Sequence, residues 1–421
     1  MFNSILFDKS AFESLNIDKI FFLHQYYFPV VSHILIIEIL ADLKKEDTDR
    51  DKYERVQQLS HKILQLNPNY TVQYQDLIER ELSGEYIELG RRPIVAQGRN
   101  VISETGQKGV VIPQQVEEQI LQRWHERKFD EADILYADQW RKSIEANSID
   151  IANLDRPEEI QSLKNLPDIT NFVDQYMSHP DAQLDILNNV LTLYHVNPSI
   201  ASQIYYKYET NQFSHLCTVA PYCCFCYKIF LTFSFALARG IYTPRKTDII
   251  DLQYLYYLPF ATIFTSNDKF HKMFAPLFLE DDQIFILGSD LKNDLSKIVA
   301  VRDSLENEER AEWVLEHRQY PPDIESSFTS ELWKQHVRPT LRTSDESGKV
   351  RTSEENKKIV DRTNRLANSP INTEYAGPFK DEETDFVIIE RKIGPNDFCP
   401  CMSGKLFKDC HLPEVKRNKN T

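Results

Sequence analysis

Carboxylate side chains follow two apolar segments of this sequence, at positions where acidic oxygens could gather in one pocket. Asp8 directly follows the run from Ser4 to Phe7, and Asp268 comes shortly after the run from Ala261 to Phe264. Ligands of open α/β sheets bind just beyond the carboxyl ends of the strands. We therefore expect Asp8 and Asp268 to face one site. The alternative is that they are only helix caps or turn residues.

Three further positions add oxygen ligands to this set. Glu38 lies within the apolar stretch from Ile34 to Leu43, and either Asp248 or Asp251 opens a later helix. A carboxylate on a buried helix is costly unless it is paired, so the alternative for Glu38 is contact with solvent or with a buried Arg or Lys. Thr265 precedes Asp268 and could hold a water molecule.

Packed carboxylates repel one another, and their pKa values rise unless cations neutralise them. Oxygen ligands of this kind suit one or two Mg²⁺ or Mn²⁺ ions. Two such ions stabilise the attacking and the leaving oxygen when water hydrolyses a phosphodiester bond. The acidic set therefore predicts metal-dependent phosphodiester hydrolysis.

Short strands alternating with helices must position these side chains. Apolar, β-prone runs predict strands at Ser4 to Phe7, Phe28 to Val31, Ala261 to Phe264 and Gln283 to Leu287. Apolar helices are expected at Ile20 to Tyr27, Ile34 to Leu43 and Lys269 to Phe278. This alternation predicts an α/β domain with a parallel sheet flanked by helices.

The composition changes between the two halves of this predicted domain. Residues 46–215 are more polar and proline-punctuated, with helical periodicity, and predict a helical insertion. The expected α/β domain is thus split into residues 1–45 and 216–295. A helical extension and polar linker are expected at residues 296–392, and a small separate module at residues 393–415.

The overall composition is that of an ordinary globular protein, but its charge is strongly acidic. The 421 residues are 41% hydrophobic and 27% charged, with a net charge of −15. This charge disfavours nucleic-acid binding by bulk electrostatics, so any nucleic-acid role would depend on local basic patches or on metal ions. We expect the apolar segment from Leu216 to Ala238 to be a buried core helix and not a membrane span, because it contains Pro221 and Lys228.

The seven cysteines do not resemble a disulfide framework in so long a chain, and the N-terminus carries no secretory signal. A reducing, cytoplasmic compartment is therefore expected. Cys223, Cys224 and Cys226 lie beside aromatic residues in an apolar segment. They favour core packing over a second metal site.

A different cysteine group near the C-terminus has metal-ligand spacing. The pattern C-x-C-x8-C-H is formed by Cys399, Cys401, Cys410 and His411. Such ligands suit a tetrahedral structural Zn²⁺. The segment is too short to bury a core, so zinc binding would supply its folding free energy. The alternative is a set of scattered cysteines in a tail.

Four segments together resemble a PIN-like nuclease domain: LFDKSAF, VVSHILIIEIL, IIDLQYLYYLP and FTSND. That family uses three or four acids to bind Mg²⁺ or Mn²⁺ and cut RNA, less often DNA. The resemblance implies that Asp8, Glu38, Asp251 and Asp268 are the four acids in chain order. Asp248 competes for the third position, although its spacing of 20 residues from Asp268 suits the family less well than the 17 residues from Asp251. The long insertion before the third acid departs from the family.

The cysteine segment GPNDFCPCMSGKLFKDCHLP resembles the SEC-C motif, with Met402 in place of a usual Gly. This bacterial zinc module serves mostly to dock proteins, ribosomes or lipid. The two resemblances imply a metal-dependent endoribonuclease, such as a toxin or phage-defence effector. The alternative is a catalytically inactive PIN-like scaffold that binds a ribosome or protein partner through its helical insert and zinc tail. Oligomers are compatible with either. His24, His33 and His271 lie near the acidic set and are expected to be structural.

Overall fold

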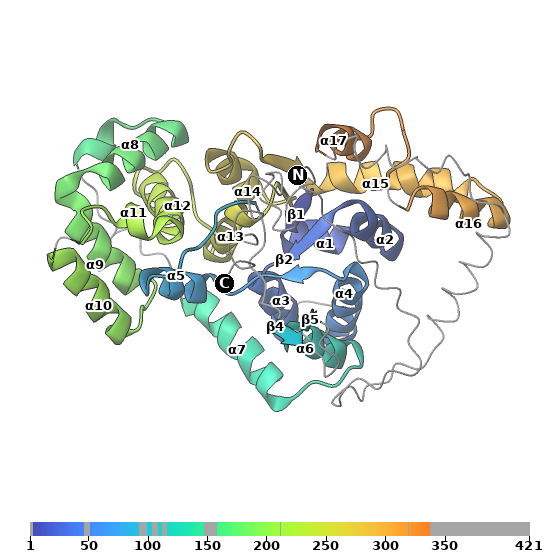
Figure 1. Ribbon diagram of the computed structural model, residues 1–421, viewed down its shortest axis with the longest axis horizontal. Helices are drawn as coiled ribbons and strands as arrows, with labels where there is room; N and C mark the ends of the chain where they lie inside the picture. The colour runs from blue at the N-terminus through green and yellow to red at the C-terminus, as the bar shows by residue number, and fades with distance from the viewer. Residues whose placement is uncertain are drawn as a thin grey trace, which may run out of the picture. The chain divides into compact units, whose positions relative to one another are not determined.

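A parallel five-stranded sheet lies at the centre of the chain (Figure 1). The computed structural model describes residues 3–45, 51–91, 99–102, 108–111, 116–146, 158–210, 212–318 and 320–336. The strand order is β3-β2-β1-β6-β7, and every neighbouring pair is parallel. The strands are β1 (Ser4–Phe7), β2 (Phe28–Val31), β3 (Asn69–Tyr70), β6 (Ile263–Ser266) and β7 (Ile284–Leu287). The predicted α/β class with a parallel sheet and flanking helices is confirmed.

The central strands β1 and β6 are buried along their whole length, and β2 is buried except at Phe28, which explains their apolar character. All four residues of β1 and all four of β6 are buried, as expected for a parallel sheet covered on both faces. Strand β3 has no apolar run in the sequence that would predict it. It has only two residues and lies inside the range expected for the helical insertion, and the sequence analysis missed it.

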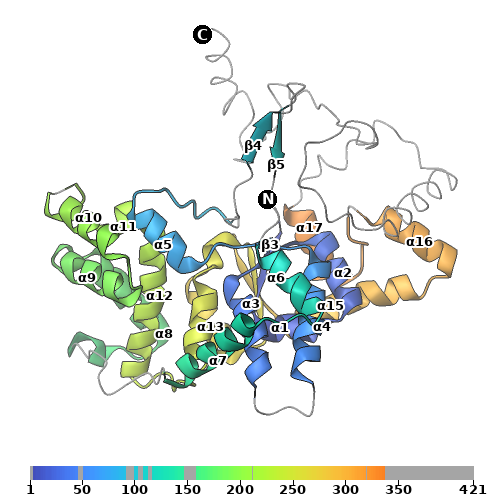
Figure 2. The ribbon, with the colours of Figure 1, turned by 90° about the horizontal axis from the view of Figure 1, so that it is seen from below.

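The helices surround this sheet and extend beyond it. Their bounds are α1 Lys9–Ser14, α2 Ile17–Tyr26, α3 His33–Leu40, α4 Lys52–Leu66, α5 Tyr74–Leu82, α6 Val116–His125, α7 Glu131–Ala146, α8 Leu166–Ser178, α9 Gln183–Leu193, α10 Pro198–Glu209, α11 Leu216–Val219, α12 Pro221–Ala238, α13 Asp248–Leu255, α14 Lys269–Phe274, α15 Gly288–Asp303, α16 Asn307–Glu316 and α17 Phe328–His336. A separate antiparallel hairpin consists of β4 (Arg99–Ile102) and β5 (Lys108–Val111). Helices α13 and α14 lie on one side of the sheet, and α1 and α2 lie on the other (Figures 1 and 2).

Helix α12 is the centre of the helical part of the chain. It contacts α5, α8 and α13, and α8 also packs against α9. In the described part of the chain, α12 is the helix whose length and composition would allow it to cross a membrane, but 72% of that span is buried inside the protein. Lys228 forms an ion pair with Asp174 of α8 at 2.6 Å. These contacts are those of a core helix, which is the interpretation that the sequence favours.

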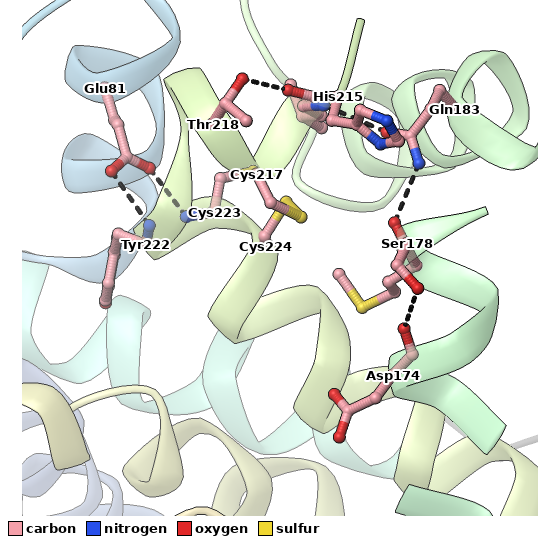
Figure 3. Close-up of a disulfide and its surroundings, with 12 residues drawn as sticks. Glu81, Asp174, Ser178, Gln183, His215, Cys217, Thr218, Tyr222, Cys223 and Cys224 are labelled. Atoms are coloured by element: carbon pink, nitrogen blue, oxygen red, sulfur yellow. Dashed lines mark hydrogen bonds between the residues drawn. A yellow bond between two sulfur atoms is a disulfide. The ribbon is translucent and has the colours of Figure 1, made fainter. Parts of the chain in front are cut away.

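The start of α12 carries two features that the sequence analysis did not predict (Figure 3). The buried carboxylate of Glu81, from α5, accepts hydrogen bonds from the backbone N–H groups of Tyr222 (3.0 Å) and Cys223 (2.8 Å). A disulfide joins Cys217 of α11 to Cys224 of α12. The sequence does not predict a disulfide framework, yet this one pair is bonded, because the turn between the two helices brings the two residues within bonding distance.

Two other cysteines of α12 behave as the sequence predicts. Cys223 and Cys226 are free and buried, and burial raises the pKa of both thiols. The range Phe2–Val337 forms one compact unit. The finer domain boundaries and the cytoplasmic location stay predictions.

Candidate metal and phosphodiester site

Asp8 stands at the carboxyl end of β1, beside the point where the strand order changes direction. Its carboxylate is almost fully buried and caps α1 by accepting the N–H of Ala11 at 2.9 Å. It also accepts the hydroxyl groups of Ser10 at 2.8 Å and of Ser266, at the end of β6, at 2.7 Å. Two donors from the start of α1 and one from the end of β6 therefore hold this carboxylate in one orientation. Ligands bind at such a switch point in open α/β sheets.

His271 connects Asp8 to a second acidic segment. Its imidazole is fully buried, with Nδ1 2.8 Å from Ser266 Oγ and 3.5 Å from Asp8 Oδ2. Nε2 lies 2.7 Å from the carbonyl oxygen of Asp251. Burial lowers the pKa of His271, but the hydrogen bond and charge of Asp8, together with the charge of Asp251, raise it more, so the net pKa is raised. The geometry fits a positioning role for this histidine.

Glu38 reaches the same region from α3. Its carboxylate accepts a hydrogen bond from the buried hydroxyl of Tyr254 at 2.5 Å. Lys9 does not pair with this carboxylate but donates to the backbone carbonyl of Glu38 at 2.8 Å. Burial raises the pKa of Glu38, while the charge of Lys9 and the Tyr254 hydrogen bond lower it, and the net pKa is raised. The sequence analysis predicted the acid but not its tyrosine partner.

The remaining acids surround one arginine, Arg245. Asp248 is fully buried and accepts the backbone N–H of Arg245 at 2.6 Å and its Nε at 2.9 Å. Asp268 accepts Nη2 at 2.8 Å and Nη1 at 3.2 Å, and Asp251 accepts Nη2 at 3.3 Å. Asp248 Oδ1 also lies 2.8 Å from Nη2, so Asp248 contacts the backbone N–H and the Nε edge of the arginine, whereas Asp251 and Asp268 contact only Nη1 and Nη2. The sequence analysis did not single out Arg245.

Asp251 and Asp268 differ in their electrostatic environment. Burial is the main factor that raises the pKa of Asp251 to about 7, with His271 lowering it and the charges of Asp268 and Glu38 raising it. Burial also raises the pKa of Asp268, but the Arg245 hydrogen bond and the N–H of Phe270 lower it more, so the net pKa is lowered. Asp251 is therefore the less well compensated carboxylate of the two.

The hydroxyl that meets the acids belongs to Ser266, the neighbour of the predicted Thr265. Thr265 is fully buried, and its Oγ1 has no hydrogen-bond partner among the described residues. Successive side chains of a strand point to opposite faces of the sheet. Since Ser266 points to Asp8, Thr265 points to the other face. The expectation that Thr265 positions a water molecule at these acids does not fit this geometry.

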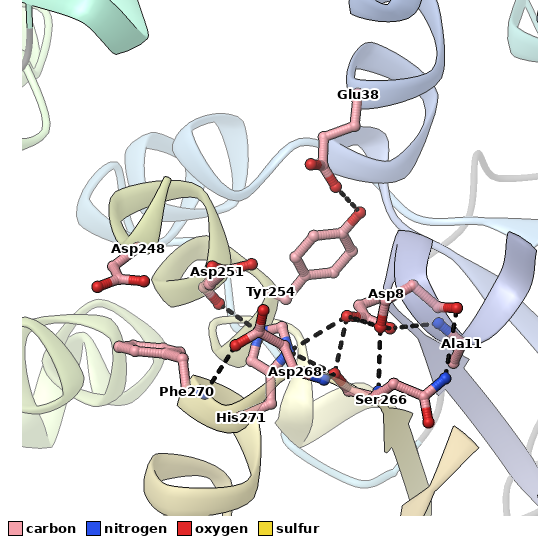
Figure 4. A network of polar contacts seen from close by, with 12 residues as sticks. Asp8, Ala11, Glu38, Asp248, Asp251, Tyr254, Ser266, Asp268, Phe270 and His271 are labelled. Carbon is pink, nitrogen blue, oxygen red and sulfur yellow. Dashed lines mark hydrogen bonds and ion pairs between the residues drawn. The ribbon is translucent and has the colours of Figure 1, made fainter. Parts of the chain in front are cut away.

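Figure 4 shows the carboxyl groups of Asp8, Glu38, Asp251 and Asp268 around one region, with Asp248 farther out. They come from the end of β1, from α3, from α13 and from the loop after β6. Within the described ranges, no group of three or more His, Cys, Asp or Glu side chains is placed so that it could hold a metal ion. The acids are gathered, but their present partners are hydroxyl, amide and guanidinium groups.

The proposed zinc ligands Cys399, Cys401, Cys410 and His411 lie outside the described residues. Residues 396–413, which contain these four side chains, match the SEC-C motif. No curated protein and no solved structure matches the chain significantly.

Proposed function

We propose that this chain is a metal-dependent endoribonuclease with a PIN-like catalytic domain. One observation carries the proposal: four carboxylates from separate segments surround the carboxyl edge of the sheet at its switch point. Oxygen-only ligands at a switch point are suited to a divalent cation and a phosphate ester. The likeness of the four acidic segments to PIN-like nucleases supports RNA over DNA as the substrate.

The acids fit a hard divalent ion by donor chemistry and by charge. Asp8, Glu38, Asp251 and Asp268 would hold Mg²⁺ or Mn²⁺. The raised pKa values of Glu38 and Asp251 indicate carboxylates that lack a sufficient counter-charge, and an added cation would favour their ionised form. When bound, such an ion supplies Lewis acidity, which polarises a phosphoryl oxygen and lowers the pKa of water.

The residues of the chain itself would orient these ligands. Ser266 and Ser10 fix the Asp8 carboxylate, and Tyr254 fixes that of Glu38. His271 ties the backbone at Asp251 to Ser266 and so keeps the helix and the strand end together. Preorganised ligands of this kind are worth more than mobile ones, because no reorganisation is required during the reaction.

The C-terminal SEC-C motif supports a second part of the proposal. Zn²⁺ bound by Cys399, Cys401, Cys410 and His411 would order a docking module for a ribosome or protein partner. A nuclease that carries such a docking module would fit the role of a toxin or phage-defence effector, and we propose that role for the chain.

The alternative function is a catalytically inactive scaffold that recruits such a partner through its helical insert and zinc tail. Two observations favour it: Arg245 already neutralises part of the acidic set, and the chain carries a net charge of −15. Against it, a scaffold has no need to hold the Glu38 carboxylate against the buried Tyr254 hydroxyl.

The experiment that separates these functions measures cleavage. Purified protein is incubated with end-labelled single-stranded RNA, tRNA and single-stranded DNA in Mn²⁺ or in EDTA. The nuclease proposal predicts RNA cleavage in Mn²⁺ only, and a loss of about 100-fold or more in Asp8→Asn and Asp268→Asn.

Asp281→Asn is the matched control, because Asp281 is an exposed acid beyond the site, and it should cleave at the wild-type rate. Cleavage that survives both site substitutions would end the four-acid proposal. If no substrate is cleaved in any metal, the scaffold is the better account.

A further inference from the structure

We propose that Arg245 binds a substrate phosphate and that, in the absence of substrate, it serves as the internal counter-ion of the acids. This inference rests on the nuclease function proposed above. Arg245 is a cation that lies among acids otherwise suited to a metal ion, and the inference gives it a role there. The role is to exchange its carboxylate partners for a phosphate when a divalent ion binds.

The base of the Arg245 side chain is firmly anchored. Asp248, which is fully buried, accepts both the backbone N–H and Nε of Arg245, and its own N–H donates to the carbonyl of Arg245 at 3.1 Å. These three hydrogen bonds between Asp248 and Arg245 fix the position of the Arg245 backbone and of its Nε. They also explain why the sequence offers two acids here: Asp248 positions the arginine, and Asp251 is left for the site.

The end of the side chain contacts two further acids besides Asp248, whose Oδ1 lies 2.8 Å from Nη2. Nη1 and Nη2 contact Asp268 at 3.2 and 2.8 Å, and Nη2 contacts Asp251 at 3.3 Å. The Arg245 side chain is 49% exposed, whereas those of Asp268 and Asp251 are 22% and 15% exposed. The guanidinium therefore faces solvent on one side and the acids on the other, and a ligand can approach it without unfolding the anchor.

Charge explains why such an exchange is needed. A phosphodiester is repelled by a group of carboxylates, and the net charge of −15 gives no compensating field. Lys9, another cation beside the site, is already occupied by Asp42 at 2.7 Å and by the Glu38 carbonyl. When a divalent ion neutralises Asp251 and Asp268, the end of Arg245 is released from both.

The guanidinium has the geometry that this role requires. Its planar fork presents parallel N–H donors that match two oxygens of a phosphate, which a lysine ammonium does not reproduce. The anchor at Asp248 uses Nε and one side of Nη2. The edge formed by Nη1 and Nη2, which now contacts Asp268, remains for a new partner. Arg245 would thus touch the substrate directly, beside the acids that hold the metal.

Two binding measurements test this role. Calorimetric titration of Mn²⁺ into substrate-free protein should show about tenfold tighter binding to Arg245→Met than to wild type. Such a change corresponds to removing one competing charge-assisted hydrogen bond. Fluorescence anisotropy of a short labelled RNA, with Ca²⁺ in place of Mn²⁺, should show about tenfold weaker binding to the same variant.

Two further variants serve as controls. Lys246→Met removes a neighbouring exposed cation and should match wild type in both assays. Arg245→Lys keeps the charge but not the fork, and it should restore RNA binding only in part. Thermal melting of each variant verifies folding. If Arg245→Met does not fold, Arg245→Lys alone decides, because a purely structural cation would leave RNA affinity at the wild-type level.

The outcomes separate the inference from the nuclease proposal. Unchanged RNA affinity in a folded Arg245→Met variant overturns the phosphate role, and unchanged Mn²⁺ affinity overturns the counter-ion role. If Arg245→Met shows both changes but the wild-type protein never cleaves RNA, the role of Arg245 is supported and the nuclease function is rejected. Wild-type protein that binds no Mn²⁺ would contradict both.

Discussion

Asp42 is the centre of an ion-pair cluster beside the site, and replacing it by Asn should destabilise the protein strongly. Its side chain is fully buried in the turn that follows α3. The carboxylate lies 2.7 Å from Lys9 Nζ, 2.9 Å from Arg55 Nε and 3.6 Å from Arg141 Nη2. The cluster thereby joins α1, α4 and α7 to the core of the α/β domain.

The size of the effect follows from the burial of the carboxylate and the exposure of its partners. Removing one partner of a buried ion pair costs about 3–5 kcal/mol, because a charge is left uncompensated. The side chains of Lys9, Arg55 and Arg141 are 14%, 24% and 31% exposed, so water can recover part of that cost. We therefore expect Asp42→Asn to lower the free energy of unfolding by about 3 kcal/mol.

Urea unfolding followed by far-ultraviolet circular dichroism measures this change. Asp138→Asn is the matched control: Asp138 pairs with Lys142 at 2.7 Å on an exposed helix surface. An exposed pair of this kind contributes little to stability, because solvent screens its charges. If Asp42→Asn and Asp138→Asn differ from wild type by the same small amount, the cluster does not stabilise the fold and the reasoning from burial is wrong.

Three other predictions concern pH, the disulfide and zinc. Burial raises the pKa of Glu81 from 4.5 to about 7, so its contribution to stability is full below pH 4.5 and is lost as the pH rises to about 7. Chemical denaturation across this range should show that the free energy of unfolding falls by roughly 3 kcal/mol more in wild type than in Glu81→Gln. Parallel curves of stability against pH for the two proteins would refute the assignment. The Cys217–Cys224 disulfide should make wild type about 2 kcal/mol more stable than Cys217→Ser; dithiothreitol should lower the melting temperature of wild type but not of the variant, and an equal response of both would contradict the bond. Zinc content by atomic emission should be about one ion per chain and should fall in Cys399→Ser but not in Cys226→Ser; unchanged zinc in the first variant would remove the zinc site.

The sheet could be predicted from the sequence because its strands are continuous apolar runs. All four predicted strands occur in the structure, within two residues of their expected bounds. β3 could not be predicted in this way, because two residues carry no periodicity. Its pairing with β2 depends on contacts distant in sequence, which local patterns do not contain.

The acids of the site were also accessible from the sequence, but their partners were not. Strand ends and an unusual acid in an apolar helix pointed to Asp8, Asp268 and Glu38. The hydroxyl at these acids was predicted to be that of Thr265. It is that of Ser266, because side chains alternate between the two faces of the sheet at the end of β6 and Ser266 is the one that points to Asp8. Arg245 stands in a loop without a pattern of its own, so only the folded chain shows that it contacts three carboxylates.

The central claim is that Asp8, Glu38, Asp251 and Asp268 form one divalent-metal site, and anomalous scattering from crystals grown with Mn²⁺ tests it most directly. The account predicts a manganese peak about 2.1 Å from carboxylate oxygens of this set, with the end of Arg245 displaced from Asp251 and Asp268. A metal-free site with Arg245 still bound to both acids, or manganese bound only at other acidic side chains, would contradict it.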